Sequence, residues 1–255
     1  MKIAVACHKA YWMSEDPVYL YLSVGDALRP APIPGTVPDS TGENISAKNA
    51  SFCELTGLYW IWKNLDEDVL GLCHYRRYFA QSRFGSGKKR ILTGARARAL
   101  MADTPVLLPK KRHYWIETNY SQYAHAHHAI DLDKTREILA QAYPDYLPAF
   151  DAVMERTSGH RFNMLLMRAD VLDAYCTWLF AVLAEAEQRM DIRGYDAYNR
   201  RVYGFLGERL LDVWVETNHV PYTELPMVFL ENQHWLKKGT AFLRRKFRGE
   251  RAELR

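Results

Sequence analysis

The sequence predicts an α/β protein, a single domain in which a mostly parallel sheet is flanked by helices. Short apolar runs of strand length alternate with longer segments that carry apolar residues at helical spacing. The strand-like runs are apolar throughout, as expected of parallel strands that are buried on both faces. The length of 255 residues suits one large domain or two small ones.

The elements follow from these patterns in chain order. Strands are expected at residues 2–6, 69–73, 106–108 and 162–167, and within 222–231. Residues 11–38 hold five prolines and are expected to be irregular. Helices are expected at residues 50–65, 94–103, 133–157, 169–190 and 199–218, with breaks in the third at Pro144 and Pro148. Ser51 and Glu54 fit a capping box at the start of the first helix.

The composition is that of a globular chain. Apolar residues make up 48% and charged residues 25% of the sequence, which is enough for a core without the charge excess of disordered chains. No window approaches eighteen uninterrupted apolar residues, so no membrane-spanning helix is expected. The first residues are too short an apolar run for a signal peptide and lack a cleavage site, so a cytoplasmic protein is expected.

The cysteines indicate thiols in a core. Cys7, Cys53, Cys73 and Cys176 are dispersed, and none belongs to a CxxC pair. Each lies in an apolar run, which predicts reduced, buried side chains. Two of them directly precede a histidine, but neighbours on a strand point to opposite faces, so each pair offers a metal one ligand. Core packing is therefore favoured over zinc binding.

The net charge of +4 hides an uneven distribution. Residues 236–255 carry eight Lys or Arg against two Asp or Glu, which leaves 26 basic and 28 acidic residues elsewhere. A near-neutral body with a basic tail is expected of a protein that touches an anionic membrane surface, where each nearby cation contributes about 1 kcal/mol. A solvated terminus without a partner is the alternative. The acidic balance of the body argues against a nucleic-acid groove.

Cationic side chains follow three of the predicted strands. His8 and Lys9 follow the first strand, and longer sets follow the second and the third. The longer sets are His74, Tyr75, Arg76 and Arg77 after the second strand, and Lys110, Lys111 and Arg112 after the third. Ligands of open α/β sheets bind beyond the carboxyl ends of the strands, and arginine and lysine match phosphate oxygens. The three ends together predict a site for a polyanion such as a nucleoside diphosphate, although each alone could mark a strand leaving the core.

The loop at residues 39–49 is a second candidate binding segment. It precedes a helix, where free backbone N–H groups favour anions or hydroxyls. The residues proposed for donor binding are Asn44, Ser46, Lys48 and Asn49, with Asp39 and Glu43 proposed for the sugar or acceptor. The segment is neither a P-loop nor a GxGxxG fingerprint. A plain capped loop is the alternative.

Five segments carry a resemblance to a known family. They read TGENISAKNASFCELTGLYWIWKN, GLCHYRRYF, LLPKKR, NMLLMR and YGFLGERLLDVW, in this order. The chain resembles bacterial glycosyltransferases of polysaccharide biosynthesis, formerly catalogued as domain of unknown function 4422 and grouped as glycosyltransferase family 111. That family includes galactofuranosyltransferases of O-antigen, capsule and lipopolysaccharide assembly. The likeness covers residues 2–231, nearly the whole chain.

The resemblance implies a GT-A-like, Rossmann-type domain at residues 1–235, followed by the basic tail at residues 236–255. It also implies a UDP-sugar donor and a lipid-linked or oligosaccharide acceptor at the inner face of the cytoplasmic membrane. The expected reaction is transfer of a hexose, with galactofuranose as the best expectation, and with inversion. A pyranosyl donor stays open.

The resemblance also bears on metal dependence. Many GT-A enzymes hold a divalent cation on an Asp-x-Asp motif at the end of a central strand, where this sequence has His74, Tyr75 and Arg76. Residues 131–133 read DLD but begin a helical stretch and follow no strand. We therefore expect no metal cofactor and assign its role to the arginine and lysine cluster. Dependence on Mn²⁺ or Mg²⁺ stays open.

Glu208 is the candidate general base of an inverting transfer. It follows two glycines in an apolar segment, where a carboxylate is costly unless it is used or paired. An ion pair with Arg209 or Arg201 is the alternative, and Asp39 and Glu43 are reserve candidates. Asn163 is a candidate sugar or acceptor contact.

Two functions of other classes remain open from the sequence. One is a catalytically inactive scaffold of a polysaccharide-assembly complex, and the other is a nucleic-acid-binding module that uses arginines with interleaved aromatic residues. His125 and His128 share a helix face, but we assign no function to them.

Overall fold

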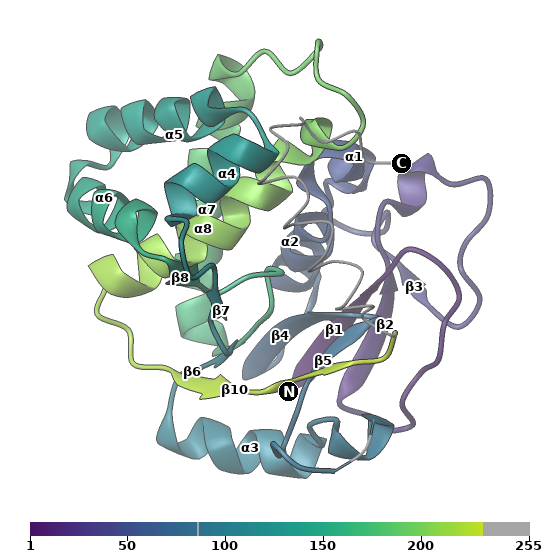
Figure 1. Ribbon diagram of the computed structural model, residues 1–255. Coiled ribbons are helices and arrows are strands. Elements are labelled where there is room, and N and C mark those ends of the chain that lie inside the picture. The colour runs from purple at the N-terminus through teal and green to yellow at the C-terminus, as the bar shows by residue number, and fades with distance from the viewer. Residues whose placement is uncertain (86, 232–255) are drawn as a thin grey trace.

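The computed structural model describes residues 1–85 and 87–231 and shows an α/β domain built on a mixed sheet (Figure 1). The sheet order is β10-β6-β9-β4-β1-β2-β3, with β5 joined to β4 and β11 joined to β5. The strands are β1 (Lys2–Cys7), β2 (Tyr19–Ser23), β3 (Val37–Pro38), β4 (Val69–His74), β5 (Arg77–Phe79), β6 (Val106–Pro109), β9 (Leu165–Arg168), β10 (Thr223–Leu225) and β11 (Met227–Phe229). β7 (Arg112–His113) and β8 (Ser158–Gly159) form a separate antiparallel ribbon.

Helices cover both faces of the sheet, with α3 on one side and the remaining α-helices on the other (Figure 1). The α-helices are α1 (Asn49–Phe52), α2 (Leu55–Asn64), α3 (Gly94–Asp103), α4 (Asn119–Ala126), α5 (Ala129–Ala142), α6 (Leu147–Glu155), α7 (Ala169–Arg189) and α8 (Val202–Thr217). Short 3₁₀ turns are η1 (Asp26–Leu28), η2 (Ser46–Lys48), η3 (Gly87–Arg90), η4 (Pro144–Tyr146) and η5 (Asn199–Arg201). This arrangement confirms the predicted fold class.

The apolar strands are explained by burial on both sides. In β1, Ala4 and Ala6 join the apolar cluster beneath α2, α7 and α8, whereas Ile3 and Val5 join the cluster that includes α3 residues. Side chains alternate between the two faces of a strand, so a strand covered on both faces has no polar side. The same physics explains why β1, β4 and β6 were predictable as continuous apolar runs.

The sheet departs from the expected topology at β9. This strand lies between β4 and β6 and is antiparallel to both, whereas β1, β2, β3 and β4 are parallel neighbours and β6 is parallel to β10. It also begins at Leu165, three residues after the predicted start. Phe162 and Asn163 have φ angles of 76° and 49°, which are left-handed conformations that no strand contains.

Two further expectations for the first part of the chain were wrong. Residues 11–38 contain β2 and β3 despite their prolines. The helix predicted at residues 50–65 is broken at Cys53, whose φ of 53° ends α1. Ser51 donates to the Lys48 carbonyl instead of capping a helix, and Glu54 stands at the N-cap of α2.

The four thiols are free and buried, as the sequence predicts. Burial raises the pKa of the Cys7 and Cys53 thiols to about 12. None of the helices in the described residues combines the length and apolarity needed to cross a bilayer. The basic tail at residues 236–255 lies outside the described residues, so its proposed membrane contact stays a prediction.

Gly71, in the middle of β4, gives a test of the packing between β4 and β9. A Cβ at this position would lie 2.8 Å from the Leu165 carbonyl oxygen and 2.6 Å from Leu166 Cδ1. Gly71→Ala should lower the free energy of unfolding by about 1–3 kcal/mol, because the backbone at Leu165 must shift to make room for the added methyl group. Gly194→Ala is the control, since no atom lies within 4 Å of its Cβ position, and it should change stability by less than about 0.5 kcal/mol. Chemical denaturation of both variants measures the difference, and equal stabilities would contradict the packing.

Candidate active site

A cavity of about 740 Å³ opens beyond the carboxyl ends of β1 and β4. Seven arginines and two glutamates carry the formal charges of its lining. The lining residues are His8, Asn49, Ala50, Cys53, Glu54, His74, Tyr75, Arg76, Arg77, Arg112, Tyr114, Gln122, His127, Arg161, Phe162, Ala197, Tyr198, Arg200, Arg201, Phe205, Glu208 and Arg209. This excess of cations makes the cavity suited to a polyanion.

The end of β4 supplies the arginines closest to the sheet. The chain reverses between β4 and β5, so that Arg76 lies at the turn and Arg77 opens β5. Arg76 Nη1 lies 3.2 Å from Glu231 Oε2. Arg77 forms no ion pair within residues 1–85 and 87–231, and its guanidinium lies 4.3 Å from the centre of the Phe162 ring.

The environment of Arg77 is unfavourable for a lone cation. Burial and the neighbouring Arg76 lower the pKa of the Arg77 guanidinium. The Nε atoms of both arginines are buried and make no hydrogen bond in the described part of the chain. An anionic ligand in the cavity would therefore relieve both the repulsion and the unmet hydrogen bonds.

Three histidines of the lining are held neutral at pH 7. Burial, followed by Arg29 and Arg201, lowers the pKa of His8 to about 4. Burial and Arg77 lower the pKa of His74 to about 2. Burial is also the main cause that lowers the pKa of His127 to about 4. The positive charge of the cavity is therefore carried by arginines, which keep it at all physiological pH values.

Glu208 projects from α8 into the cavity. One carboxylate oxygen accepts a 3.0 Å hydrogen bond from the backbone N–H of Phe162, and the other lies 3.7 Å from Arg209 Nη1. Within the described residues Arg201 forms no ion pair with Glu208, and its Nε donates to the Cys53 sulfur at 3.2 Å. Glu208 thus has both the cavity position expected of a base and the Arg209 neighbour of the alternative interpretation.

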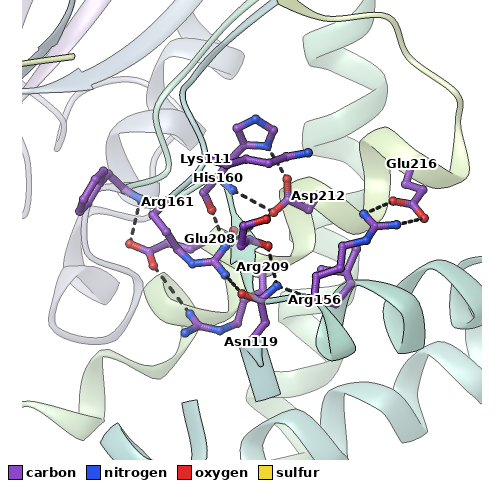
Figure 2. Close-up of polar contacts among 12 residues, drawn as sticks. Lys111, Asn119, Arg156, His160, Arg161, Glu208, Arg209, Asp212 and Glu216 are labelled. Carbon is purple, nitrogen blue, oxygen red and sulfur yellow. Dashed lines mark hydrogen bonds and ion pairs between the residues drawn. The ribbon is translucent and has the colours of Figure 1, made fainter. Parts of the chain in front are cut away.

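Arg161 and its partners form the wall behind Glu208 (Figure 2). The Arg161 guanidinium donates to Asn119 and to the Tyr114 hydroxyl, and lies 3.6 Å from Asp212. Asp212 also accepts from both the backbone and the ring of the buried His160. The charge of Arg161 is therefore balanced within the fold, unlike that of Arg77.

Glu54 is a cavity residue that the sequence analysis assigned only to capping. The positive φ of Cys53 separates α1 from α2 and leaves Glu54 at the junction, among the cavity-lining residues. Burial, followed by repulsion from Glu208, raises the pKa of its carboxyl group. No sequence signal marks this break, because cysteine has no preference for left-handed backbone.

Two glycines in α8 allow this helix to pack closely against the α1–α2 junction. A Cβ on Gly204 would lie 3.0 Å from the Cβ of Cys53, and one on Gly207 would lie 2.8 Å from Leu55 Cδ1. Larger residues would hold α8 away from the α1–α2 junction. Gly204 and Gly207 therefore allow α8, which carries Glu208, to pack against the α1–α2 junction, which carries Glu54.

The predicted loop at residues 39–49 contributes only one lining residue, Asn49. The others serve the loop itself. Asp39 is buried and accepts from the N–H groups of Gly25 and Asp26 and from the hydroxyls of Ser46 and Thr56. Asn44 donates to the backbone carbonyls of Ser40 and Gly42. Glu43 accepts from the Tyr59 hydroxyl, and Lys48 donates to Glu187.

The third predicted strand end reaches the cavity with Arg112 but not with Lys110 or Lys111. β9 separates β6 from β4, so the end of β6 lies two strands away from the end of β4. Lys111 Nζ lies 3.1 Å from the Tyr222 hydroxyl. Lys9 also lies outside the lining and pairs with Glu231 at 3.6 Å.

Asn163 stands behind the lining. Its amide nitrogen donates to Glu54 Oε1 and to the Gly204 carbonyl, both at 3.0 Å. Asn163 is therefore a support for a cavity residue, and its own contact with a sugar stays a prediction.

Several lining residues were not anticipated, chiefly Arg200, Arg201 and Arg209. They come from η5 and α8, and Arg209 is buried against Tyr123, whose ring centre lies 4.6 Å from its guanidinium. A pattern of apolar residues at helical spacing predicts the helix but not which of its arginines faces a cavity.

Asp131, Asp133 and His125 are engaged by other side chains of the protein. Asp131 is buried in α5 and accepts from the hydroxyls of Tyr123 and Tyr195, and Asp133 accepts from Tyr120. His125 contacts Glu117 at 2.7 Å. Within the described ranges, no group of three His, Cys, Asp or Glu residues is arranged to hold a metal ion.

A family model described as a domain of unknown function, DUF4422, matches residues 2–219. The chain belongs to this family. No curated protein sequence matches this DUF4422 chain significantly. A solved apo structure of WbbM, a bifunctional glycosyltransferase, is similar with a TM-score of 0.85 and 29% identity. The match covers 91% of the DUF4422 chain and 45% of the WbbM chain, so this chain spans less than half of that protein. The likeness identifies the fold as a glycosyltransferase fold.

Asp39→Asn tests the supporting role of the loop. An amide in place of the carboxylate sets N–H groups against the donors that now point at Asp39, so the free energy of unfolding should fall by about 2–3 kcal/mol. Glu43→Gln, on the exposed part of the same loop, should change it by less than about 0.5 kcal/mol. Thermal and chemical denaturation compare the two variants. An Asp39→Asn protein as stable as the wild type would show that the network is not structural.

Proposed function

We propose that this DUF4422 protein is a glycosyltransferase that takes a hexose from a UDP-sugar donor. The observation that carries the proposal is Arg77, which forms no ion pair within residues 1–85 and 87–231 and stands beside Arg76 at the end of the central strand β4, inside a cavity with seven arginines. Partly buried guanidinium groups with unmet hydrogen bonds are stabilised by a bound diphosphate, which offers several oxygens at hydrogen-bond distance. The similarity to part of WbbM supports the same reaction class.

The finer assignment follows the family resemblance. The donor is proposed to be UDP-galactofuranose, and the acceptor a growing O-antigen, capsule or exopolysaccharide glycan, lipid-linked or as an oligosaccharide. Peripheral contact with the inner face of the cytoplasmic membrane through residues 236–255 is part of the proposal. A catalytically inactive scaffold, which would transfer no sugar, and a nucleic-acid-binding protein are the alternatives.

The proposed reaction is a single displacement with inversion. The acceptor hydroxyl oxygen forms a bond to the anomeric carbon while the bond from that carbon to the diphosphate oxygen breaks, and the electron pair leaves with UDP. Glu208 accepts the hydroxyl proton. Arg76 and Arg77 stabilise the negative charge that grows on the leaving diphosphate, because they are fixed in place before the reaction begins.

The residues at the end of β4 do not fit a divalent metal ion. His74, Tyr75 and Arg76 stand there in place of carboxylates, and both carboxylates of the cavity already accept hydrogen bonds from Phe162 and Asn163. Magnesium and manganese prefer carboxylate oxygens. We therefore propose that the arginines, and not Mn²⁺ or Mg²⁺, neutralise the diphosphate.

Arg77→Met removes the Arg77 cation and keeps the apolar part of the side chain. The dissociation constant for UDP should rise about tenfold to a hundredfold, which corresponds to a lost charge-assisted contact of about 1.5–3 kcal/mol. Lys110→Met is the matched control, because Lys110 lies outside the lining, and it should leave UDP affinity unchanged. Isothermal titration calorimetry measures both. A larger loss in the lysine variant would place the diphosphate elsewhere.

Glu208→Gln should lower the rate of sugar transfer by about 100-fold to 10,000-fold, the range of general base catalysis. UDP binding should be retained, since the amide keeps an oxygen for the Phe162 N–H. A radiolabelled or mass-spectrometric transfer assay gives the rate, and calorimetry gives the affinity. Turnover like that of the wild type would remove Glu208 from the mechanism.

Metal removal tests the role of the arginines. Transfer by the wild type should be unaffected by excess EDTA and should not rise on addition of Mn²⁺ or Mg²⁺. The assay uses enzyme that was dialysed against chelator, with a known metal-dependent glycosyltransferase as the positive control. Complete loss of activity that Mn²⁺ restores would refute the metal-free mechanism.

A further inference from the structure

An exposed tryptophan stands on a tight turn beside the cavity. The backbone N–H of Ile116 donates to the Tyr114 carbonyl at 2.8 Å, and Trp115 between them has a φ of 65°. A hydrogen bond that spans three residues with a positive φ at the centre is the rare and strained form of the γ-turn. Left-handed backbone is unusual for a bulky residue and costs of order 1–3 kcal/mol. The chain therefore holds Trp115 in place against a local penalty.

The turn is fixed on both sides. Before it, β7 pairs with β8, and the Tyr114 N–H donates to the Thr157 carbonyl at 2.8 Å. The Tyr114 hydroxyl accepts a 2.9 Å hydrogen bond from Arg161 Nε. After the turn, Thr118 and Ser121 form a capping box at the start of α4. The surrounding structure thus enforces the strained conformation, which is the condition under which such strain persists.

Packing does not explain the position of Trp115. Its side chain is 88% exposed, and that of Ile116 is 61% exposed. Its aromatic contact within the described residues is with His113, and the two ring centres lie 6.3 Å apart. Large apolar side chains that gather at the surface mark interaction sites. Strain and exposure at the same residue indicate that the turn serves a ligand.

The turn lies at the rim of the cavity. Tyr114 and Arg112 belong to the lining, whereas Trp115, the next residue along the chain, lies outside it. A ligand that extends out of the cavity past Tyr114 therefore meets the indole. In the proposed reaction the sugar that is modified lies inside, next to Glu208. A sugar that reaches Trp115 is then a more distant unit of the same acceptor.

The chemistry of the turn fits a sugar ring. The face of an indole carries negative π charge, and one face of a hexopyranose presents C–H groups with partial positive charge, so the two stack while the hydroxyl groups stay in water. Residues 113–118 contain one glutamate and no lysine or arginine, whereas an anionic membrane surface is recognised by clustered cations. Two side chains are also far too few for a stable protein interface. A glycan is the partner that these observations favour.

We propose that Trp115 and Ile116 form a rim subsite, which stacks on a sugar of an oligosaccharide acceptor beyond the sugar that reacts. The proposal rests on the proposed function, and it adds that the acceptor is longer than a single sugar. The rim subsite then selects for acceptor length, because a monosaccharide bound inside the cavity does not reach it.

Trp115→Gly removes the indole and leaves a residue that adopts left-handed backbone without steric cost. The thermal unfolding midpoint of this variant should equal or exceed that of the wild type, because strain is relieved and no packing is lost. The probes for binding are tetrasaccharides of galactose, glucose and mannose, together with the methyl glycosides of the same sugars. Affinity for tetrasaccharides should fall by about threefold to tenfold, the range of one aromatic stacking contact. Affinity for the methyl glycosides should not change.

Phe84→Ala is the matched control, because Phe84 is 87% exposed and lies outside the lining, between β5 and α3. It should bind every probe as the wild type does. Titrations followed by saturation-transfer difference NMR, with UDP present, give the affinities. A midpoint several degrees lower in Trp115→Gly would make Trp115 a packing residue and refute the rim subsite. Equal tetrasaccharide affinity in wild type and Trp115→Gly, the same loss in Phe84→Ala, or no tetrasaccharide binding to the wild type would also overturn it.

The binding data separate this inference from the proposed function. If tetrasaccharides bind through Trp115 but the wild type transfers no sugar to any acceptor, the transferase proposal fails and the rim subsite stands. If the wild type transfers sugar and Trp115→Gly binds tetrasaccharides equally well, the rim subsite is refuted and the transferase stands.

Discussion

Unbalanced positive charge at the carboxyl end of β4 is the constraint on which the cavity depends. Arg76 and Arg77 are adjacent, and their Nε atoms are buried without hydrogen-bond partners among the described residues. Of the two, Arg76 alone forms an ion pair there, with Glu231. Partial desolvation of two like charges is unfavourable. The fold tolerates it through contacts with aromatic faces, Tyr75 under Arg76 and Phe162 under Arg77. Neutral histidines at the same place avoid adding to the repulsion.

The other half of the site depends on close packing between α8 and the α1–α2 junction. Gly204 and Gly207 remove the side chains that would separate them, and Cys53 takes a conformation that breaks the helix there. These features are unfavourable for an isolated helix, since glycine lowers helix stability by about 1 kcal/mol per residue. Their placement beside the lining indicates that local stability is given up to build the cavity. The mixed sheet and its two apolar layers provide the stability that makes this tolerable.

The parts of the structure that sequence reasoning recovered depend on local patterns. β1, β4 and β6 are predictable because burial on both faces demands continuous apolar runs, and the arginines at the end of β4 follow directly. The parts it missed depend on distant contacts. Lys110 and Lys111 looked equivalent to Arg76 and Arg77, but the insertion of β9 beside β4 moves them away, and no local signal shows this. Glu54 matched a capping pattern because the left-handed backbone at Cys53 has no sequence signature.

The small β7–β8 ribbon connects a lining arginine to the residues that donate to the cavity carboxylates. Arg112 in β7 pairs with Gly159 in β8, and the chain runs from Gly159 through His160 and Arg161 into Phe162 and Asn163, which hold both carboxylates. The lining cation Arg112 and the donors to both cavity carboxylates thus belong to one stretch of paired backbone. A shift of this ribbon would therefore move Arg112 together with the residues that donate to Glu54 and Glu208.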